Sequence, residues 1–229
     1  MRYLDAATIE ALAPIADLVD AVDAAYRDIA EGRDRSPLRS AIELPGGSLL
    51  IMPGVRDGAT GVSLKIVSIV PENKRRALPT VQAIAAWVDG RTGTPTALLD
   101  GNALTALRTG AGTAAATRRL ARPGAAELAM IGAGGQAEWQ VRAVCAVRPI
   151  RRVRVWSPSP RRDALVETLL GKLPGADVVA ASSAEEAVRG AHVVCCATTS
   201  SEPVLDAAWV APGAHVNGIG AFRPGMVEL

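Results

Sequence analysis

A glycine-rich turn is the part of the sequence whose residue types and spacing point most directly to chemistry. The apolar run at residues 127–131 is typical of a buried strand, and Gly132, Gly134 and Ala137 follow it in a G-x-G-x-x-A pattern. In such a turn the first glycine permits a tight bend, the second lets the backbone approach a phosphate, and the small third residue lets a helix pack closely on the strand. The start of that helix supplies amide donors and a positive dipole to an anion. The pattern predicts a binding site for the pyrophosphate of a dinucleotide.

The sequence after this turn supports the same interpretation and bears on the choice of cofactor. An amphipathic segment with Val141 and Val144 on one face leads to a second apolar strand at 153–156, which is the spacing that the motif requires. An acidic residue at the end of that strand would bind the ribose 2′-hydroxyl of NAD and repel a 2′-phosphate. Residues 157–162 are SPSPRR and contain no acid, so we expect NADP, with NAD as the alternative. The candidate ligands in this loop are Ser157, Ser159, Arg161 and Arg162.

Lys65 is a second candidate for chemistry, because it lies inside the apolar run VSLKIV at 62–67. Burial disfavours the charged form of an ammonium group and lowers its pKa, so a desolvated lysine can exchange a proton near neutral pH or hold a carboxylate. The alternative is that Lys65 lies on the solvent face of a half-buried strand. Residue types alone favour the second interpretation.

The composition excludes several classes of protein. With 229 residues, of which 49% are hydrophobic and 21% charged, we expect a soluble globular protein of two domains or one large one. No apolar run approaches the ~20 residues of a membrane span, and the N-terminus carries acids where a signal peptide would be basic, so we expect a cytoplasmic protein without a membrane partner. A net charge of +2 and an aromatic content of 3% argue against a nucleic-acid partner.

Cysteine and histidine give no sign of a metal site or of a disulfide framework. Cys145, Cys195 and Cys196 lack C-x-x-C spacing, and neither His192 nor His215 has a ligand-spaced carboxylate or thiol nearby in the sequence. Adjacent Cys195 and Cys196 in a strand would point to opposite faces of a sheet, where they would act as small core hydrophobes. We therefore expect no metal.

The N-terminal part of the chain is expected to form an α+β domain with a mostly antiparallel sheet. A helix is predicted from near Pro14 to Gly32, and strand-like runs separated by turn residues follow it. Consecutive strands joined by short turns pair antiparallel, so this portion is separate from the nucleotide-binding sheet. The apolar stripe of the helix comprises Ile15, Leu18, Val22, Tyr26 and Ile29. The predicted strands lie at 38–44, 48–52, 62–70, 81–89 and 96–99.

The remainder alternates strands and helices, which predicts an α/β fold with a Rossmann-type, doubly wound parallel sheet. An Ala- and Gly-rich helix is expected at 102–121, and Arg122, Pro123 and Gly124 break the chain after it. We therefore expect an N-terminal domain at 1–121 and an NAD(P)-binding domain at 122–229. The predicted strands lie at 127–131, 153–156, 177–180, 192–198 and 215–219, and the predicted helices at 136–147, 160–170 and 184–189.

An ordered set of motifs resembles the ornithine cyclodeaminase and mu-crystallin family. LTALRTGAGTAAATRRLARP at 104–123 is followed by MIGAGGQA at 130–137, a combination that is typical of that family. The matching segments cover most of the chain from Arg39 onward, and their order is far more specific than the glycine pattern alone. The other segments are LKIVSIVPEN (64–73), LPTVQA (78–83), VDGRTGTPTALLDG (88–101), ATTSSEPVL (197–205) and HVNGIGAFRPGMVEL (215–229).

The resemblance implies a nicotinamide enzyme that acts at the α-carbon of an amino or cyclic imino acid. Known members bind NAD or NADP and catalyse the cyclising deamination of ornithine, the dehydrogenation of alanine, or the reduction of ketimines such as pyrroline-2-carboxylate. In each reaction a hydride moves between nicotinamide and a carbon that bears nitrogen, while the protein orients the substrate carboxylate and manages one proton. The resemblance also implies that the first domain binds the substrate and that its sheet forms a homodimer.

The site residues of the family can be carried over residue by residue. Arg108 matches its substrate-binding arginine, whose planar guanidinium suits a carboxylate, and Lys65 matches its site lysine, as proton donor or carboxylate ligand. The resemblance implies Arg39 as a second carboxylate ligand, Met52 as a pocket wall and Thr80 as a contact to substrate or nicotinamide. The alternatives are a solvated helix position for Arg108, a surface position for Arg39, core packing for Met52 and a strand-start hydroxyl for Thr80. The implied cofactor contacts, besides the SPSPRR loop, are Thr109, Gly132, Ala133, Gly134, Gln136, Ala137, Thr198, Thr199, Ser200, Asn217, Gly218 and Gly220.

One departure from the family bears on the reaction. Its cyclodeaminases carry an aspartate after a Gly-Ala pair, where this chain has Phe222 after Gly220 and Ala221. Phenylalanine cannot accept a proton or order an attacking water, so we expect NAD(P)H-dependent reduction of a small cyclic imino acid, such as pyrroline-2-carboxylate to proline. The alternatives are a lyase that converts ornithine to proline and ammonia with recycled NAD, and a non-catalytic, crystallin-like protein that binds NADP.

The second departure is length, because family members continue well past the equivalent of Leu229. The sequence is then either a fragment or a protein whose parallel sheet has lost an edge, which would expose apolar surface and unpaired strand groups. In the second case we expect low activity.

Overall fold

The structure is a computed structural model that describes residues 1–221 and 225–229. Its two compact units comprise residues 1–17 with 21–107, and residues 18–20 with 108–229. The division falls inside α3 (Gly101–Leu120), whereas the expected domain boundary at residues 121 and 122 lies just after this helix. Among the helices of the described residues, none combines the length and the apolar character that a membrane span requires.

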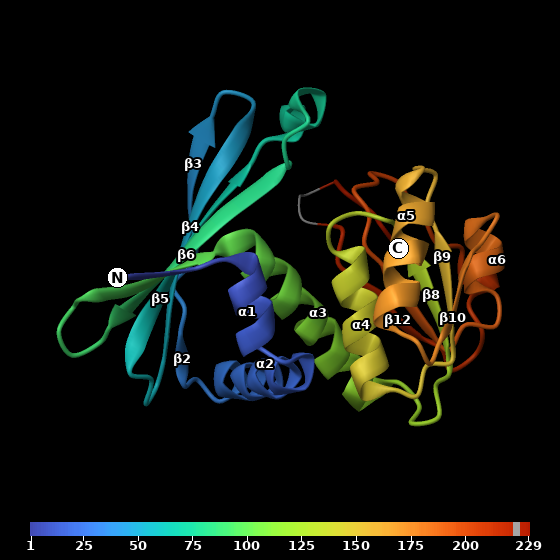
Figure 1. The fold of residues 1–229 in the computed structure, drawn as a ribbon, viewed down its shortest axis with the longest axis horizontal. Coiled ribbons are helices and arrows are strands. Elements are labelled where there is room, and N and C mark those ends of the chain that lie inside the picture. Colours follow the sequence, from blue (N-terminus) through green and yellow to red (C-terminus); the bar gives the residue numbers. More distant parts are fainter. Residues whose placement is uncertain (222–224) are drawn as a thin grey trace. The chain divides into compact units, whose positions relative to one another are not determined.

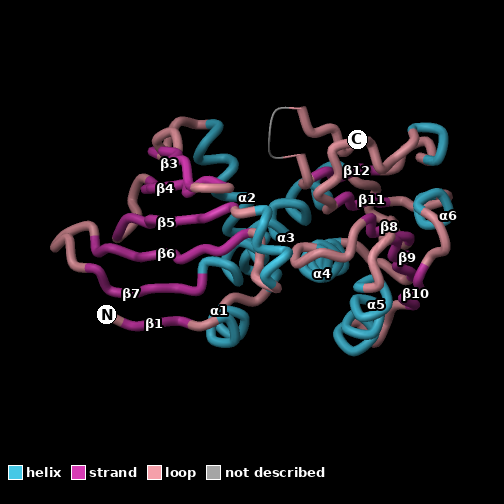
Figure 2. Tube along the Cα trace, turned by 90° about the horizontal axis from the view of Figure 1, so that it is seen from above, coloured by secondary structure: helices cyan, strands magenta, loops and turns pink. Residues whose placement is uncertain are grey.

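The described part of the first unit contains a seven-stranded sheet, which confirms the predicted, mostly antiparallel arrangement (Figure 1 and Figure 2). The strand order is β1-β7-β6-β5-β4-β2, and β3 pairs with β4 outside this path. Neighbouring strands are antiparallel except for β1 and β7, which are parallel. The strands are β1 (Arg2–Leu4), β2 (Asp34–Arg35), β3 (Ser40–Leu44), β4 (Gly47–Arg56), β5 (Gly61–Ile69), β6 (Val81–Asp89) and β7 (Pro95–Asp100).

Several short elements of this unit are absent from the sequence prediction. These are β1, β2, the helix α1 (Ala6–Leu12) and the 3-10 helix η1 (Pro71–Arg76). Asp5 begins α1 as its N-cap, because its carboxylate accepts a hydrogen bond from the backbone N–H of Thr8 at 2.8 Å. Elements of two to seven residues carry too little hydrophobic periodicity to be recognised, so the prediction opens the domain one helix too late.

The helix predicted near Pro14 is α2 (Ile15–Ala30), but its predicted apolar stripe is partly wrong. Tyr26 and Ile29 are each 56% exposed, whereas Asp28 is only 4% exposed. The carboxylate of Asp28 accepts a hydrogen bond from Arg33 at 2.7 Å and forms an ion pair with Arg56 of β4. A buried carboxylate is stable only when it is paired, so ion pairs and not apolar periodicity set the buried face of the C-terminal half of α2.

The second unit contains a five-stranded sheet in its described residues, and all of its strands are parallel as predicted. The order is β10-β9-β8-β11-β12, so the first strand of the unit lies at the centre. The strands are β8 (Glu127–Ile131), β9 (Arg152–Trp156), β10 (Asp177–Ala180), β11 (Val193–Cys196) and β12 (His215–Gly218). The helical segments are α4 (Ala137–Val147), α5 (Arg161–Lys172), α6 (Ala184–Val188) and the 3-10 helix η2 (Ala207–Trp209).

Apolar clusters cover both faces of the parallel sheet, which explains why its strands are continuous hydrophobic runs. Cys195 belongs to the cluster that includes Leu128 and Val141, and Cys196 belongs to the cluster on the other face. The prediction that the two thiols point to opposite faces is therefore confirmed. Burial raises the pKa of both thiols to about 12, so they stay protonated and unreactive at neutral pH.

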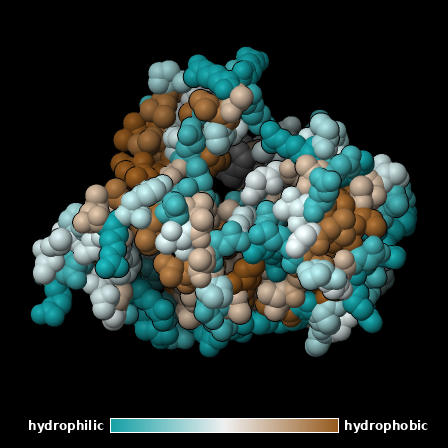
Figure 3. Space-filling view, viewed as in Figure 1, coloured by the Kyte–Doolittle hydropathy of each residue, from teal (hydrophilic) through white to brown (hydrophobic). Residues whose placement is uncertain are grey.

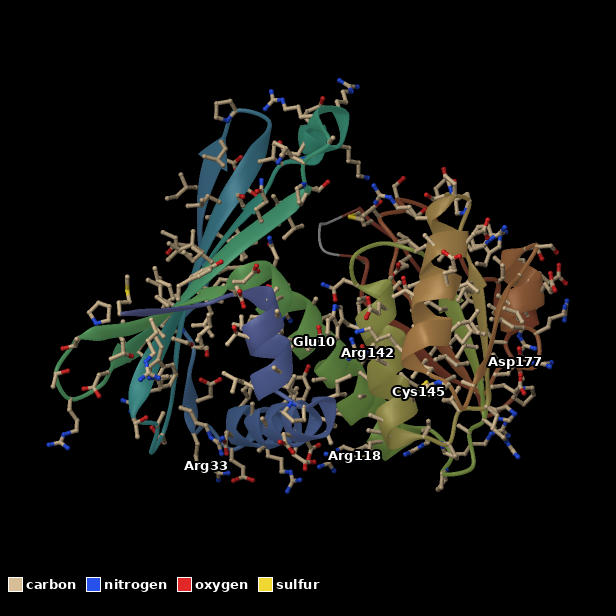
Figure 4. All side chains as sticks on the ribbon, viewed as in Figure 1. Glu10, Arg33, Arg118, Arg142, Cys145 and Asp177 are labelled. Carbon is tan, nitrogen blue, oxygen red and sulfur yellow. The ribbon has the colours of Figure 1, made fainter. Side chains whose placement is uncertain are left out.

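Close contacts within the second unit hold α3 at two points along its length. A Cβ atom at Gly110 would lie 2.6 Å from the carbonyl oxygen of Trp139, in the first turn of α4. At the end of α3, the guanidinium of Arg148 donates hydrogen bonds to the carbonyl oxygens of Arg118 and Ala121 at 2.7 Å each (Arg118 is labelled in Figure 4). The packing of α3 on α4 thus requires a glycine at position 110, and the last carbonyl groups of α3 are capped by the guanidinium of Arg148.

Two helical glycines of this unit should respond to alanine with opposite signs. Gly110→Ala should lower the free energy of unfolding by about 1–3 kcal/mol, because the methyl group meets backbone that cannot yield. Gly171→Ala should raise it by up to about 1 kcal/mol, because a Cβ in α5 meets nothing within 4 Å and alanine is the better helix former. Urea unfolding of both variants and the parent measures the changes. A stable Gly110→Ala protein would contradict the contact with Trp139.

Candidate functional site

The turn after β8 has the backbone geometry that its glycine pattern predicts. Gly132 has a φ of 108°, a conformation that side chains disfavour. Its N–H donates to the carbonyl oxygen of Trp156 at 2.8 Å, and a Cβ here would lie 2.5 Å from the carbonyl oxygen of Ala197. A residue with a side chain at this position would therefore push apart the turn and the segment that follows β11.

The next residues of the turn form an open cradle. Gly134 and Gly135 are exposed, and a Cβ built on either would meet nothing within 4 Å, so their backbone is accessible to a ligand. Ala137 is completely buried where α4 begins, as close helix packing requires. The side chain of Gln136 does not cap this helix, and its Oε1 atom is buried without a hydrogen-bond partner among the described residues. An accessible backbone beside an uncapped helix start fits a pyrophosphate.

The sheet order places this turn at a topological switch point. From β8 the chain proceeds to β9 and β10 on one side, and then returns to β11 and β12 on the other side. In open parallel sheets, ligands bind outside the carboxyl ends of the strands at such a point. The segment at 198–200 follows β11, and residues 219 and 220 follow β12, so the fold brings both to the same edge as the glycine turn.

The loop after β9 contains two hydroxyls and two guanidinium groups, which differ in how far other groups of the protein already engage them. Ser157 accepts a hydrogen bond from the N–H of Ser159, and Ser159 accepts one from the N–H of Arg161, so both hydroxyls keep their own proton for donation. The guanidinium of Arg162 donates to the carbonyl oxygen of Ala181 at 3.1 Å and to the carboxylate of Asp163. Arg161 is exposed, and its guanidinium makes no hydrogen bond or ion pair in the described residues. Arg161 is therefore the cation of this loop that an anion can reach without breaking a contact.

Glu228 is a site residue that the sequence analysis misses. It is only 2% exposed, and its carboxylate accepts hydrogen bonds from the N–H and the hydroxyl of Thr198 and from the N–H of Gly220. The hydroxyl of Thr198 also accepts from the N–H of Ser200 at 3.2 Å, so its bonding capacity is largely used within the protein. The signal in the sequence is an acid in the short apolar segment MVEL.

Other predicted cofactor residues in β12 and just after it have contacts inside the protein. The side-chain amide of Asn217 donates to Thr117 Oγ1 at 3.1 Å, and its oxygen lies 3.0 Å from Nε2 of His215. A Cβ at Gly218 would lie 2.6 Å from the side chain of Leu229, and one at Gly220 would overlap Glu228. Close packing therefore accounts for both glycines. Thr199 is exposed. Phe222 lies outside the described residues.

In the first unit, strand register brings three of the predicted substrate residues together. Lys65 of β5 is half-buried and pairs with Met52 of β4 and with Ala85 of β6, so all of them lie on one face of the sheet. Arg39 is exposed and directly precedes β3, whose first residue pairs with Ile51, so continuation of the register places Arg39 opposite Met52. This face carries the buried side chain of Ala85, which is 4% exposed, so Lys65 lies on the core side of the sheet.

Thr80 lies away from this group along the sheet. Its carbonyl oxygen accepts a hydrogen bond from the N–H of Val70, at the end of β5 that is distant from Lys65. The register therefore does not place Thr80 beside Lys65.

Arg108 and Thr109 belong to α3 in the second unit. Arg108 is exposed and Thr109 is half-buried. They are the two residues before Gly110, whose contact with Trp139 holds this part of α3 beside the first turn of α4. Arg142 of α4 lies 4.3 Å from the centre of the Trp139 ring, so the indole is fixed from its face as well (Arg142 is labelled in Figure 4). Arg108, the predicted carboxylate ligand, thus lies near the helix that begins at the glycine turn.

Comparison with known proteins identifies the family. The profile described as the ornithine cyclodeaminase/mu-crystallin family matches residues 2–229. A Δ1-pyrroline-2-carboxylate reductase of Bacillus cereus is 35% identical over 207 residues, which are 90% of this chain and 63% of the relative. The chain thus spans less than two thirds of the length of this curated relative.

Two solved structures have the same fold. The Δ1-pyrroline-2-carboxylate reductase of Thermococcus litoralis, in complex with NADH and L-proline, superposes with a TM-score of 0.90 at 35% identity, over 96% of this chain and 68% of that one. An archaeal alanine dehydrogenase dimer with bound NAD has a TM-score of 0.89 at 32% identity, over 100% of this chain and 70% of that one. With its glycine turn, its sheet order and these matches, the chain belongs to the ornithine cyclodeaminase/mu-crystallin family.

Proposed function

We propose that the protein is an NAD(P)H-dependent reductase of a small cyclic imino acid such as pyrroline-2-carboxylate. The observation that carries the proposal is the open glycine turn at the switch point of a parallel sheet, in a chain whose relatives include pyrroline-2-carboxylate reductases. The relative with NADH and L-proline supports the same pair of ligands. A cyclic imino acid suits the face around Lys65, where the neighbours in register, Met52 and Ala85, are uncharged.

The residues of the second unit would hold the dinucleotide. The backbone at Gly134 and Gly135 and the start of α4 bind the pyrophosphate, and the segments after β11 and β12 line the nicotinamide half. The remaining implied contacts, Thr109, Ala133 and Gln136, lie on α3 or in the turn itself. When bound, nicotinamide supplies the hydride, and the protein supplies binding, orientation and a proton.

The cationic side chains would manage the substrate. We assign a carboxylate-binding role to Arg108 in the second unit and to Arg39 in the first, because a planar guanidinium is well suited to charge-assisted hydrogen bonds with a carboxylate. Lys65 donates the proton to the imine nitrogen or adds its charge to the carboxylate site. Reduction of the C=N bond adds a hydride to the carbon and a proton to the nitrogen, so the product is the cyclic amino acid.

Substitution of the cations should separate substrate binding from cofactor binding. The activity is measured as the oxidation of NADPH or NADH in the presence of pyrroline-2-carboxylate or piperideine-2-carboxylate. The loss of absorbance of the reduced nicotinamide monitors this oxidation. Lys65→Ala and Arg108→Ala should each raise the KM for the imino acid roughly ten-fold or more, because a charge-assisted hydrogen bond is lost. The Kd for NADPH should change little, and the matched control Lys74→Ala, at an exposed position of η1, should behave as the parent.

Three results would contradict this assignment in different ways. Unchanged kinetics in both variants would dismiss the site residues. Release of proline and ammonia from ornithine without net cofactor oxidation would select the lyase. Cofactor binding without turnover of any imino acid would select the non-catalytic protein.

We further propose that the loop after β9 selects NADP. The loop contains no acid to repel a 2′-phosphate, it offers two hydroxyl protons, and Arg161 is the guanidinium with no contact to lose among the described residues. Arg162 contributes less, because Ala181 and Asp163 already engage its guanidinium.

The preference for NADPH over NADH should depend on Arg161. Arg161→Ala should weaken NADPH roughly ten-fold and leave NADH within about two-fold, because only the 2′-phosphate loses a charge-assisted contact. Arg162→Ala should have a smaller effect. Fluorescence titration with each cofactor gives the four constants, and Arg151→Ala, exposed before the start of β9, serves as control. Equal affinity of the parent for both cofactors would refute the preference.

We also propose a homodimer through the sheet of the first unit. The face opposite Lys65 is mostly apolar, and none of the side chains that the register assigns to it is buried. Exposed apolar faces of this kind mark interfaces. Figure 3 shows apolar side chains gathered beside β3 and β4. The apolar residues that the register assigns to this face include Tyr3, Ile42, Leu49, Ile51, Pro53, Leu64, Ile66, Ile84, Ala86 and Leu98, and the polar ones include Ser40, Ser68, Gln82 and Asp100.

A charge on this face should dissociate the dimer. Ile84→Asp should yield a monomer at micromolar concentration, since Ile84 is 40% exposed in the single chain and would bring a carboxylate into an apolar interface. Ile42→Asp, at a position that is 48% exposed, repeats the test at another strand. Arg91→Glu at the tip of the β6–β7 hairpin is the control. Sedimentation equilibrium measures the mass, and a dimer in both aspartate variants would argue against this face.

A further inference from the structure

The carboxylate of Glu228 has an unusual environment for a charged group. It is 2% exposed, and no cation pairs with it in the described residues. Instead Oε1 accepts from the N–H of Thr198 at 2.6 Å and from its hydroxyl at 2.8 Å, while Oε2 accepts from the N–H of Gly220 at 2.5 Å. Hydrogen bonds from several donors are what a buried carboxylate needs in place of water. The two oxygens therefore join the segment after β11 to the segment after β12.

The backbone around Glu228 fixes the position of this carboxylate. The N–H of Val204 donates to the carbonyl oxygen of Glu228 at 3.0 Å, and the N–H of Val227 donates to the carbonyl oxygen of Ser201 at 3.4 Å. Side chains at positions 218 and 220 would overlap Leu229 and Glu228, so residues 228 and 229 fill space that the two glycines leave open. The main chain of residues 227 and 228, and not only the side chain of Glu228, thus holds this residue where β11 and β12 end.

The same carboxylate is linked to the dinucleotide turn through Thr198. A Cβ at Gly132 would lie 2.5 Å from the carbonyl oxygen of Ala197 and 3.2 Å from Cγ2 of Thr198, so the turn and Thr198 are in direct contact. A shift of Thr198 would therefore be transmitted to Gly132. The chain of contacts runs from Gly220 through Glu228 and Thr198 to the turn, and it connects the carboxyl ends of β12, β11 and β8.

We propose that Glu228 is a positioning residue for the nicotinamide cofactor, which acts by holding Thr198 and Gly220 at the edge where β11 and β12 end. This inference rests on the proposed function, because it assumes that a dinucleotide binds at the switch point. Glu228 does not exchange a proton with the substrate in this role. Its contribution is to fix the two loops before the cofactor arrives, so that binding requires no further ordering.

The sharpest variant is Glu228→Gln, which keeps the shape of the side chain. Each carboxylate oxygen faces a backbone N–H, so either orientation of the amide directs its NH2 group at a donor and breaks one side of the link. We expect the Kd for NADPH to rise roughly ten-fold, as for the loss of one charge-assisted hydrogen bond. Glu202→Gln is the matched control, because Glu202 is exposed in the same segment and its carboxylate makes no hydrogen bond in the described residues.

Fluorescence titration with NADPH and NADH reports two quantities that distinguish a positioning role from a general structural one. A positioning role changes the Kd while the number of binding sites per chain stays the same. A general structural role lowers the number of sites and the melting temperature together, and leaves the Kd of the folded fraction unchanged. The Thr198→Val variant removes only the hydroxyl contact, and we expect its Kd to rise roughly three-fold.

The outcomes separate this inference from the proposed function. If the parent protein binds neither NADPH nor NADH, the proposed function is overturned and this inference with it. If the parent binds and Glu228→Gln has the Kd of the Glu202→Gln control, only the inference is overturned. Should Glu228→Gln fail to fold, an unchanged Kd in Thr198→Val overturns the inference and a raised one supports it.

Discussion

The second unit depends on the absence of a side chain at position 132. There the backbone takes a left-handed conformation, its N–H is bonded to the end of β9, and its Cα faces the segment after β11. Strands on both sides of β8 therefore meet at one residue. A methyl group at this point would separate the turn from Ala197 and disturb every loop that ends at that edge. The tight turn after β8 and the close approach of the segment after β11 both depend on this residue.

Much of this arrangement can be predicted from the sequence because it follows from local periodicity. The alternation of strands and helices, the glycine pattern and the opposite directions of Cys195 and Cys196 all depend on neighbours within a few residues. The antiparallel hairpins of the first unit are predictable for the same reason, since short turns leave consecutive strands no other pairing.

The features that sequence reasoning misses involve partners far apart in the chain. Thr198 and Glu228 are 30 residues apart, and Thr117 and Asn217 are 100 residues apart. No periodicity within one element signals such pairs. The face of α2 is misjudged for a related reason, because Asp28 is buried by ion pairs to arginines outside the helix. For the residues carried over from the family resemblance, the hydrogen-bond partners, such as those of Asn217, come only from the structure.

The cap that Arg148 provides for α3 has a consequence for the order in which the protein is made. The carbonyl oxygens of Arg118 and Ala121 have their cationic partner 30 and 27 residues further along the chain. During synthesis the end of α3 therefore leaves the ribosome well before the guanidinium that completes it. Until β8 and α4 have emerged and folded, water must supply the hydrogen bonds of the last turn of α3. The end of α3 therefore gains its native hydrogen bonds only after α4 has folded.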